Sequence, residues 1–535
     1  KMLEENGRQD SIPAGTRLKY QIVKSPKFGR YLVAAKDLVA GEAIHRDKPL
    51  VVGPAAFFEG SFCFNCLKPI VLIMKVKNTR CTKCNVAPLC HPSCEVRYHE
   101  STECKLFQVN QSCTLEISEY PAAIILPLRL WLLKKFQPKV WETIDEMEDH
   151  MEKRRDTPVW KDRNENVVKV STKLRLIPDD DETSNLIQRL CGILDVNSFE
   201  LRSSDDSPNH LLRGIYTGAA LMAHDCRCNT HLTIDEKHEL TIYASIPIEK
   251  GSIISFNYTA SFLGTAERRE NLREGKYFEC ECVLCSDPYE LGSHLSSLIC
   301  PRCRRGYVAM QNPLTMSPYA FETKWQCDRC KSLMSGKLIK TTLDLTRSLI
   351  DDSEDSNAKA LESLLQKLLL TIHPNHYLVL ELKQKLLAVY RREMSTVQPL
   401  KKTLERMLDL CKEVLVVLDI TEPGISRLKG ITLYEMHLPT ALLANKSYNA
   451  REISSLELAS QLEDAEGLLQ KALSNLLLEP AATPEGRLAK RALKELKLLR
   501  QNTADVKALP TEMEKPKRQI KKNINIAKQQ QSNCK

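Results

Sequence analysis

Closely spaced cysteines are the residues of this chain best suited to chemistry. The chain has 20 cysteines, and many are paired as C-x2-C. Zinc takes four thiolate or imidazole ligands in a tetrahedron, and two such pairs supply them. In a chain of this size the pattern indicates metal in a reducing compartment rather than disulfides. One predicted site, similar to a zinc ribbon, consists of Cys300, Cys303, Cys327 and Cys330.

A second group of ligands lies near the N-terminus and is large enough for two ions. Eight ligands in four pairs fit two tetrahedral zinc sites. The segment has few apolar residues, so we expect it to need metal in order to fold. Its ligands are Cys63, Cys66, Cys81, Cys84, Cys90, Cys94, His99 and Cys104.

A third group is incomplete in its own segment. Cys280, Cys282 and Cys285 supply three thiolates, and zinc requires a fourth ligand. Cys226, far upstream, is the candidate for that position. A metal there would pin the end of this stretch to its beginning, with Tyr258 on the chain between them. We therefore predict four zinc ions in total.

Hydrophobic periodicity places these groups in a mixed α and β chain. The N-terminal runs read as strands of one small sheet, residues 116–216 as helices, and the region after Lys340 as successive amphipathic helices of an α-solenoid. Thr483-Pro484 has the capping hydroxyl and proline of a helix start. The expected strands are Tyr20–Val23, Phe28–Ala34, Ala43–His45, Leu50–Val52, His231–Asp235, Glu239–Tyr243 and Ile253–Tyr258.

Length and composition indicate a multidomain globular protein. The 535 residues allow three or four domains, and 42% hydrophobic with 27% charged residues is ordinary. We find no run of 18 apolar residues and no signal-peptide core, and expect no membrane span and a cytoplasmic and/or nuclear protein. The net charge of +9 is modest, so we do not predict direct nucleic-acid binding.

The stretch from Ala223 to Cys285 resembles the second half of a SET domain, the protein-lysine methyltransferase fold. That family's motif reads Asn-His-Ser-Cys-x-Pro-Asn, followed by a strand ending in a catalytic tyrosine and a post-SET C-x-C-x2-C. The first motif is kept here at His224, Cys226 and Asn229 and departs at Ala223, Asp225 and Cys228. With the N-terminal ligand cluster, which resembles a MYND zinc finger, the chain resembles the SMYD (SET and MYND domain) family and its arthropod-type branch. The resemblance covers roughly residues 17 to 505.

The resemblance implies an α+β fold, in which a MYND module and a helical insert interrupt the SET β-fold. It also implies interleaved MYND ligands, with Cys63, Cys66, Cys90 and Cys94 on one ion and Cys81, Cys84, His99 and Cys104 on the other. The expected regions are 17–57 (SET N-terminal part), 63–104 (MYND), 115–215 (helical insert), 216–262 (SET core), 276–290 (post-SET), 300–330 (extra zinc segment), 341–505 (tetratricopeptide-like helices) and 506–535 (a basic, disordered tail).

The activity implied is methyl transfer from S-adenosylmethionine to a lysine of histone and/or non-histone proteins, in transcriptional regulation. Tyr258 is then the catalytic residue. Two positions depart from the family. Ala223 replaces an asparagine that meets the methyl donor, and Lys276 stands where a second channel tyrosine is expected. The cofactor-binding residues implied are Gly29, Arg30, Ala223, His224, Tyr258 and Phe278.

The partners implied are proline-rich peptides that bind the MYND module, including those of corepressors, and we expect a monomer. An alternative function stays open. With the departures at Ala223 and Lys276, the SET fold could bind cofactor poorly or not at all. The chain would then be an interaction scaffold that uses its MYND surface and its helical domain.

Overall fold

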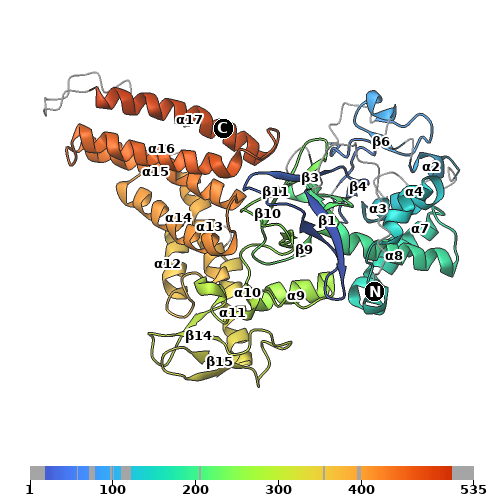
Figure 1. The fold of residues 1–535 in the computed structure, drawn as a ribbon, viewed down its shortest axis with the longest axis horizontal. Helices are drawn as coiled ribbons and strands as arrows, with labels where there is room; N and C mark the ends of the chain where they lie inside the picture. The colour runs from blue at the N-terminus through green and yellow to red at the C-terminus, as the bar shows by residue number, and fades with distance from the viewer. Residues whose placement is uncertain are drawn as a thin grey trace.

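The computed structural model describes residues 19–508, with gaps at 57, 59, 71–78, 97–98, 100–101, 110–121, 204–206, 354–355 and 395–398. Most strands lie in the middle of the molecule, with short insert helices on one side and long C-terminal helices on the other (Figure 1). Helices and sheets thus occupy separate regions, which confirms the predicted α+β class. In the described ranges, no helix has the length and apolar character needed to cross a membrane.

The predicted strands of the N-terminal region form, but our expectation that they make one small sheet is wrong. The strands concerned are β1 (Tyr20–Ser25), β2 (Gly29–Ala34), β3 (Ala43–Asp47) and β4 (Val51–Pro54). Later segments supply further strands, β7 (Ser198–Leu201), β8 (Leu212–Ile215), β10 (Thr230–Ile234) and β11 (Leu240–Ala244). They form three sheets, a β1–β2 hairpin, β10–β11–β3 and β4–β8–β7. Alternating side chains predict a strand, whereas its partner depends on distant segments.

The segment that carries Tyr258 differs from the predicted strand Ile253–Tyr258. Only β12 (Ser255–Phe256) is a strand, and it pairs in parallel with β9 (Ala223–His224). Asn229 holds this crossing together, because its side chain accepts from the Ser255 amide at 2.9 Å and donates to the Ile253 carbonyl at 2.8 Å. The ladder ends at Phe256, so Tyr258 lies just beyond it.

The MYND-like module (residues 63–104) contains little regular structure. Its described elements, with the helix that follows, are β5 (Thr79–Arg80), β6 (Pro88–Leu89), the 3-10 helix η1 (Pro92–Val96) and α2 (Cys104–Val109). β5 and β6 form a two-stranded antiparallel ladder. Two such short strands cannot hold a fold alone, which agrees with the prediction that metal organises this module.

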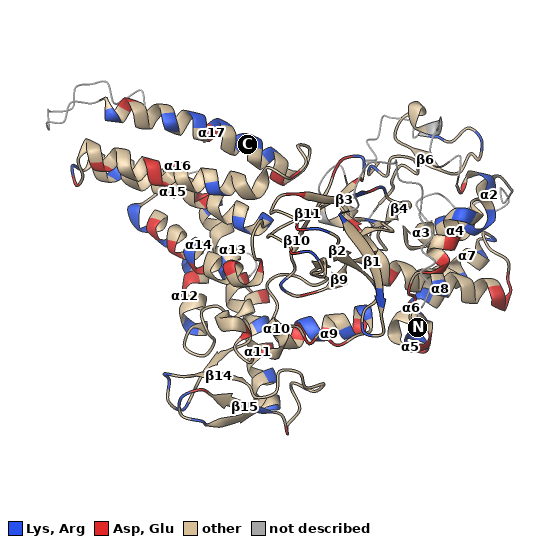
Figure 2. Ribbon diagram, in the orientation of Figure 1, with Lys and Arg blue, Asp and Glu red and all other residues tan. Residues whose placement is uncertain are grey.

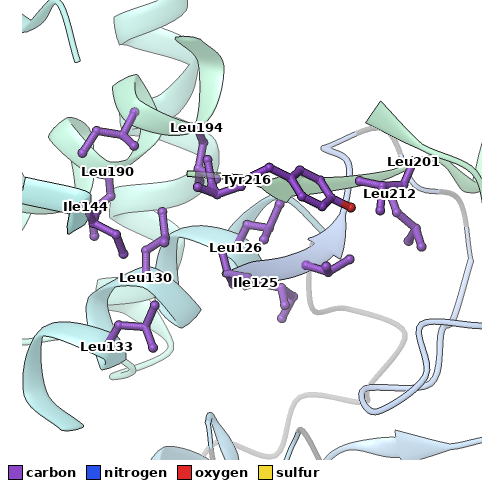
Figure 3. Packing of buried hydrophobic residues seen from close by; sticks show 14 of the residues in the cluster. Ile125, Leu126, Leu130, Leu133, Ile144, Leu190, Leu194, Leu201, Leu212 and Tyr216 are labelled. Carbon is purple, nitrogen blue, oxygen red and sulfur yellow. The ribbon is translucent and has the colours of Figure 1, made fainter. Parts of the chain in front are cut away.

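The helical insert packs on the β4–β8–β7 sheet. Its helices are α3 (Ala122–Phe136), α4 (Pro138–Asp145), α5 (Met151–Arg154), α6 (Pro158–Arg163), the π-helical turn η3 (Asn164–Val168), α7 (Lys169–Lys173) and α8 (Asp181–Asn197). Apolar side chains of α3 and α8 meet those of the sheet, among them Leu126, Leu194 and Tyr216 (Figure 3). Each such burial stabilises the fold by about 1.5 to 3 kcal/mol.

The predicted insert range of 115–215 contains strands as well as helices. The helices stop at Asn197, and residues 198–215 contain β7, the 3-10 turn η4 (Pro208–His210) and β8. These strands pair with β4, which comes from before the insert. Residues 115–121 lie outside the described residues.

After β12 the chain forms two α-helices, a 3-10 turn and a four-stranded sheet. The elements are α9 (Thr265–Lys276), α10 (Val283–Ser286), the 3-10 turn η6 (Glu290–Gly292), β13 (Leu298–Ile299), β14 (Tyr307–Met310), β15 (Lys324–Cys327) and β16 (Leu333–Ser335). A further 3-10 turn, η5 (Ala219–Leu221), precedes β9. The sheet lies at the lower end of the molecule, beneath the C-terminal helices (Figure 1).

The C-terminal region consists of seven helices among the described residues. These are α11 (Gly336–Asp351), α12 (Ala358–Leu368), α13 (Tyr377–Met394), α14 (Lys401–Thr421), α15 (Arg427–Asn449), α16 (Ser455–Leu476) and α17 (Pro484–Lys507). The large helical C-terminal part is confirmed, and the side chain of Thr483 caps α17 as predicted. The helices begin at Gly336 and end at Lys507, slightly beyond the expected 341–505. Residues 509–535 of the predicted tail lie outside the described residues.

Candidate active site and metal centres

Four groups of four side chains have ligand atoms close enough to share an ion. In each group all four atoms lie within 4.8 Å of one another, and the membership of every group is the one that the sequence predicts. Two sulfurs on one tetrahedral zinc lie about 3.8 Å apart, given a Zn–S length of about 2.3 Å. The observed separations include Cys66–Cys90 at 3.4 Å, Cys81–Cys104 at 3.7 Å, Cys226–Cys285 at 3.6 Å and Cys303–Cys327 at 3.7 Å. The donor sets therefore fit four zinc ions.

The second MYND-like site is tied to the rest of the fold by a buried ion pair. His99 lies 3.4 Å from the Cys84 sulfur through Nε2, and its Nδ1 lies 3.0 Å from a Glu103 oxygen. Arg129 of α3 contacts both Glu103 oxygens, at 2.7 and 3.2 Å, and donates to the Val52 carbonyl at 2.6 Å. Burial raises the pKa of Glu103, but Arg129 and His99 outweigh it and hold the pKa at about 2. A carboxylate thus orients the ligand histidine from the second coordination shell.

The post-SET-like cluster (Cys226, Cys280, Cys282 and Cys285) joins the two ends of the segment that contains Tyr258. Its sulfurs are largely buried, and Arg268 of α9 lies 3.7 Å from the Cys285 sulfur. Arg268 also pairs with Glu290 at 3.3 Å, where both side chains are at most 2% exposed. Cys228 lies apart from this cluster, with its sulfur 3.5 Å from the Thr230 carbonyl. The geometry favours Cys226 as the fourth ligand.

Tyr258 lies directly beside the post-SET-like cluster. Its backbone amide donates to His224 Nδ1 at 3.1 Å, and its hydroxyl donates to the Met222 carbonyl. Burial raises the pKa of Tyr258 to about 12, so the hydroxyl is neutral near pH 7. A hydroxyl that donates one bond can still accept another. The oxygen can therefore receive a hydrogen bond from an amine.

His224 connects the tyrosine with the metal ligands. Because its Nδ1 accepts a bond, Nε2 carries the proton, and Nε2 lies 3.3 Å from the Cys226 sulfur. Burial lowers the pKa of His224 to about 4, so the ring is neutral. The centre of the Phe278 ring lies 5.7 Å from that of His224 and 6.5 Å from that of Tyr258. The structure thus brings together three of the predicted site residues.

The other predicted cofactor residues occupy two different places. Ala223 is on β9, adjacent to His224, and offers no polar side-chain atom. Gly29 and Arg30 are at the tip of the β1–β2 hairpin, where Gly29 has a φ of +63° that glycine adopts without steric cost. Arg30 forms an ion pair with Glu146, whose side-chain oxygen is 2.5 Å away. Cofactor binding by these residues stays a prediction.

A cleft of about 900 Å³ opens beside Tyr258, between the SET-like core and the C-terminal helices. Glu479, in the turn after α16, lines the cleft. Its carboxylate pairs with Arg427 at 2.9 Å and with His231 of β10 at 2.9 Å, which links the C-terminal helices to the SET-like core. Basic and acidic residues are interspersed along the chain throughout the molecule (Figure 2). The lining of the cleft includes Glu200, Arg213, Phe256, Tyr258, Lys276, Arg427, Glu479 and Glu485.

The ribbon cluster (Cys300, Cys303, Cys327 and Cys330) belongs to the helical region. Cys300, Cys327 and the buried Trp325 pack in one apolar core with residues of α11 to α14. Contacts to the SET-like side are polar and apolar. Hydroxyls of Tyr319 and Tyr377 donate to Glu267 of α9 at 2.6 and 3.3 Å, and Leu314 packs against the buried cluster that contains Cys226 and Cys280. This arrangement agrees with a brace between the two regions.

Sequence reasoning missed the residues that support the site. Glu103 follows His99 at i+4, a spacing that could have suggested a carboxylate partner, but the role of Arg129 required knowledge of the α3 contact. Met222 acts through its carbonyl, which no side-chain pattern reveals. Lys276 was noted only as a departure, whereas the structure places it in the cleft wall.

The chain is similar in sequence to several known proteins. No protein-family model matches the chain. The SET domain-containing protein SmydA-8, isoform A, of Drosophila melanogaster is 27% identical over 325 residues, covering 59% of this chain and 65% of that protein. The histone-lysine N-methyltransferase SMYD3 of Homo sapiens is 24% identical over 283 residues, covering 50% of this chain and 61% of that protein.

Two further comparisons are more distant. The SET and MYND domain-containing protein DDB_G0273589 of Dictyostelium discoideum is 21% identical and covers 50% of this chain and 81% of that protein. A solved structure of Rubisco LSMT bound to AdoMet is 13% identical, with coverage of 80% of this chain and 89% of that chain and a TM-score of 0.25. The sequence relatives confirm the resemblance of the chain to SET and MYND domain-containing proteins.

Proposed function

We propose that this chain is an S-adenosylmethionine-dependent protein-lysine N-methyltransferase. The observation that carries the proposal is the position of Tyr258, a neutral hydroxyl on the wall of a cleft large enough for a side chain. His224, which accepts a hydrogen bond from the Tyr258 amide, and the adjacent zinc-ligand cluster support that position. The named relatives include a histone-lysine N-methyltransferase, which supports the same reaction class.

The residues near Tyr258 fit the cofactor in part. Phe278 and His224 offer ring faces suited to an adenine. Ala223 offers no hydrogen bond, and the absence of one charge-assisted contact costs about 1.5 to 3 kcal/mol. S-adenosylmethionine, when bound, would supply the methyl group. We expect weak but measurable binding.

Tyr258 would act on the acceptor amine by position rather than by acid–base chemistry. A lysine with a pKa near 10.4 must lose its proton, which costs about 4.6 kcal/mol at pH 7. The partly buried wall around Tyr258 disfavours the charged amine. The hydroxyl, anchored by its own bond to the Met222 carbonyl, can then receive the remaining N–H and fix the direction of the lone pair.

Replacement of the tyrosine hydroxyl tests this proposal. Tyr258→Phe should lower methyl transfer about a hundred- to a thousandfold, because a positioned group is worth roughly 2.7 to 4 kcal/mol. Cofactor affinity should change little. Radiolabelled transfer to mixed protein extracts and calorimetry would measure the two effects.

Tyr277→Phe is a matched control for this variant. Tyr277 is close in sequence to Phe278, but its hydroxyl contacts Arg154 at 3.3 Å instead of reaching the Met222 carbonyl. The control should retain transfer. Equal losses in both variants, or no loss in Tyr258→Phe, would refute the assignment of Tyr258.

A second candidate is a scaffold in which the MYND-like module binds proline-rich partners, corepressors included. Its support is the missing polar atom at Ala223 and the exposed Cys90 loop, which could border a shallow peptide groove. Under this proposal the whole chain binds a proline-rich peptide while native protein transfers no methyl group. Action on histones, a role in transcription, a monomeric state and a cytoplasmic or nuclear location belong to these proposals.

A further inference from the structure

Lys276 places an amine in the cleft wall directly against Tyr258. It is the last residue of α9, and its Nζ lies 5.7 Å from the centre of the Tyr258 ring. The same Nζ donates to the main-chain carbonyls of Val196 at 2.5 Å and Asp195 at 3.2 Å. Both ends of the side chain are therefore fixed, and the ammonium cannot swing freely into solvent.

The partners of Lys276 favour an ammonium. Val196 and Asp195 belong to the last turn of α8, where carbonyls lack helical partners and the helix end is partly negative. The face of the Tyr258 ring is also electron-rich, which adds a cation–π attraction. Three weak attractions thus replace the single carboxylate that usually pairs with a buried lysine.

The carboxylate of Asp195 is already engaged elsewhere. It forms ion pairs with Arg154 at 2.8 Å, Arg163 at 3.1 Å and Arg213 at 3.4 Å. The charged groups that face Lys276 are Asp195 and Glu200, which favour its charge, and Arg213, which opposes it. Burial first, and Arg213 second, lower the pKa of Lys276 to about 8. Near pH 7 the cleft thus contains a cation with no carboxylate partner of its own.

We propose that Lys276 is a resident ammonium that rejects a second ammonium beside Tyr258, so the cleft admits a lysine side chain poorly until one of the two amines is neutral. The naming of lysine as the acceptor rests on the proposed function. The exclusion itself follows from like charges sharing one wall of the cleft. Lys276 is then a residue that sets acceptor specificity rather than a catalytic residue.

The expected size of the effect is large enough to measure. Two unit charges about 6 Å apart, at an effective dielectric constant of about 20, change an affinity by about a hundredfold. Because Lys276 is only partly buried, solvent screening reduces this value. We expect removal of the charge to tighten lysine binding at least about tenfold.

A pair of small probes separates charge from shape. N-acetyl-lysine methylamide and N-acetyl-norleucine methylamide have similar stems, but only the first carries an amine. Their affinities for the whole protein would be measured by NMR titration at pH 7, without cofactor. In Lys276→Gln, which retains a donor for the α8 carbonyls, the lysine probe should bind at least about tenfold more tightly while the norleucine probe is unchanged.

Two further variants control this experiment. Lys276→Arg retains the charge and should match the native protein at pH 7, but because a guanidinium stays protonated to pH 9 it should not gain affinity for the lysine probe as the pH rises. Lys250→Gln removes an exposed lysine outside the cleft lining and should change neither probe. If Lys276→Gln fails to fold, the Lys276→Arg comparison and the native pH profile still decide the question.

The pH profile gives an independent readout. Between pH 7 and pH 9 Lys276 loses its proton, whereas the probe amine, with a pKa near 10.4, stays charged. Native protein should therefore gain affinity for the lysine probe over this range, and Lys276→Gln should show no such gain. Equal changes for both probes, a flat native profile, or no binding of either probe would overturn the proposal. None of these readouts requires methyl transfer, so failure of the proposed function would be seen separately in the Tyr258→Phe assay.

Discussion

The post-SET-like cluster and the ribbon cluster each consist of four cysteines, but they differ in how far apart those cysteines lie in the sequence. In the first, Cys226 joins sulfurs that are 54 and 59 positions away, and the segment between them carries Tyr258. In the second, two C-x2-C pairs lie on one small sheet that packs into the helical core. One metal therefore closes a long loop around the candidate active site, whereas the other braces a local fold.

The difference indicates which function each metal supports. Around the post-SET-like cluster, His224 contacts both Cys226 and the Tyr258 backbone, so a change at the metal reaches the cleft through one side chain. Around the ribbon cluster, the path to the cleft passes through Tyr319, Tyr377 and α9. We expect loss of the first metal to affect chemistry and loss of the second to affect the helical region.

Cys226→Ser should give the largest effect. Structural zinc binds with about 10 to 16 kcal/mol, so loss of a ligand should remove one of four zinc ions and release the loop that holds Tyr258. Metal analysis of unchelated protein should fall from about four zinc ions per chain to about three, with loss of cofactor binding. Cys228→Ser is the control and should retain all four. Equal zinc loss in both variants would mean that the fourth ligand is assigned to the wrong cysteine.

Cys327→Ser should also remove one zinc, with a different consequence. Trp325 is 1% exposed, stacks near Tyr319 and donates to the Pro318 carbonyl at 3.0 Å. Its surroundings should open, and the tryptophan fluorescence should shift to longer wavelength. Cofactor binding should be retained in part, in contrast to Cys226→Ser. A complete loss of cofactor binding in Cys327→Ser would show that the two clusters are not separable.

The sequence predicts the metal ligands well because the requirement is local and chemical. A C-x2-C pair places two thiolates on one ion whatever surrounds it, so the ribbon cluster follows from spacing alone. The partner of β3 does not follow, because β11 lies beyond the insert and pairing depends on the whole fold. The same holds for Lys276, because its contacts with the Val196 carbonyl and the Tyr258 ring join residues that are distant in the sequence.

Glu103→Gln tests a third kind of metal support, in which a buried ion pair orients a ligand. Glu103 and Arg129 are each 1% exposed, and breaking such a pair costs about 3 to 5 kcal/mol. Chemical denaturation should therefore show a clear loss of stability. Glu146→Gln removes the carboxylate partner of Arg30 from an exposed pair and should cost about 0 to 1 kcal/mol. Similar losses in both variants would contradict the idea that burial decides the difference.

Ala223→Asn should give the smallest change, because it alters β9 beside His224 and replaces none of the predicted metal ligands. Ala223 pairs with Ser255 in the parallel crossing, next to His224. An amide there could restore one charge-assisted contact worth about 1.5 to 3 kcal/mol, or about tenfold to a hundredfold in cofactor affinity. Ala223→Leu fills nearly the same volume without a polar atom, so it separates the new contact from simple crowding. Calorimetry with S-adenosylmethionine should show tighter binding for the asparagine variant alone.

If native protein and both variants give no heat, while Cys226→Ser still loses its zinc, the metal preserves a framework rather than an enzyme, and the scaffold proposal is favoured.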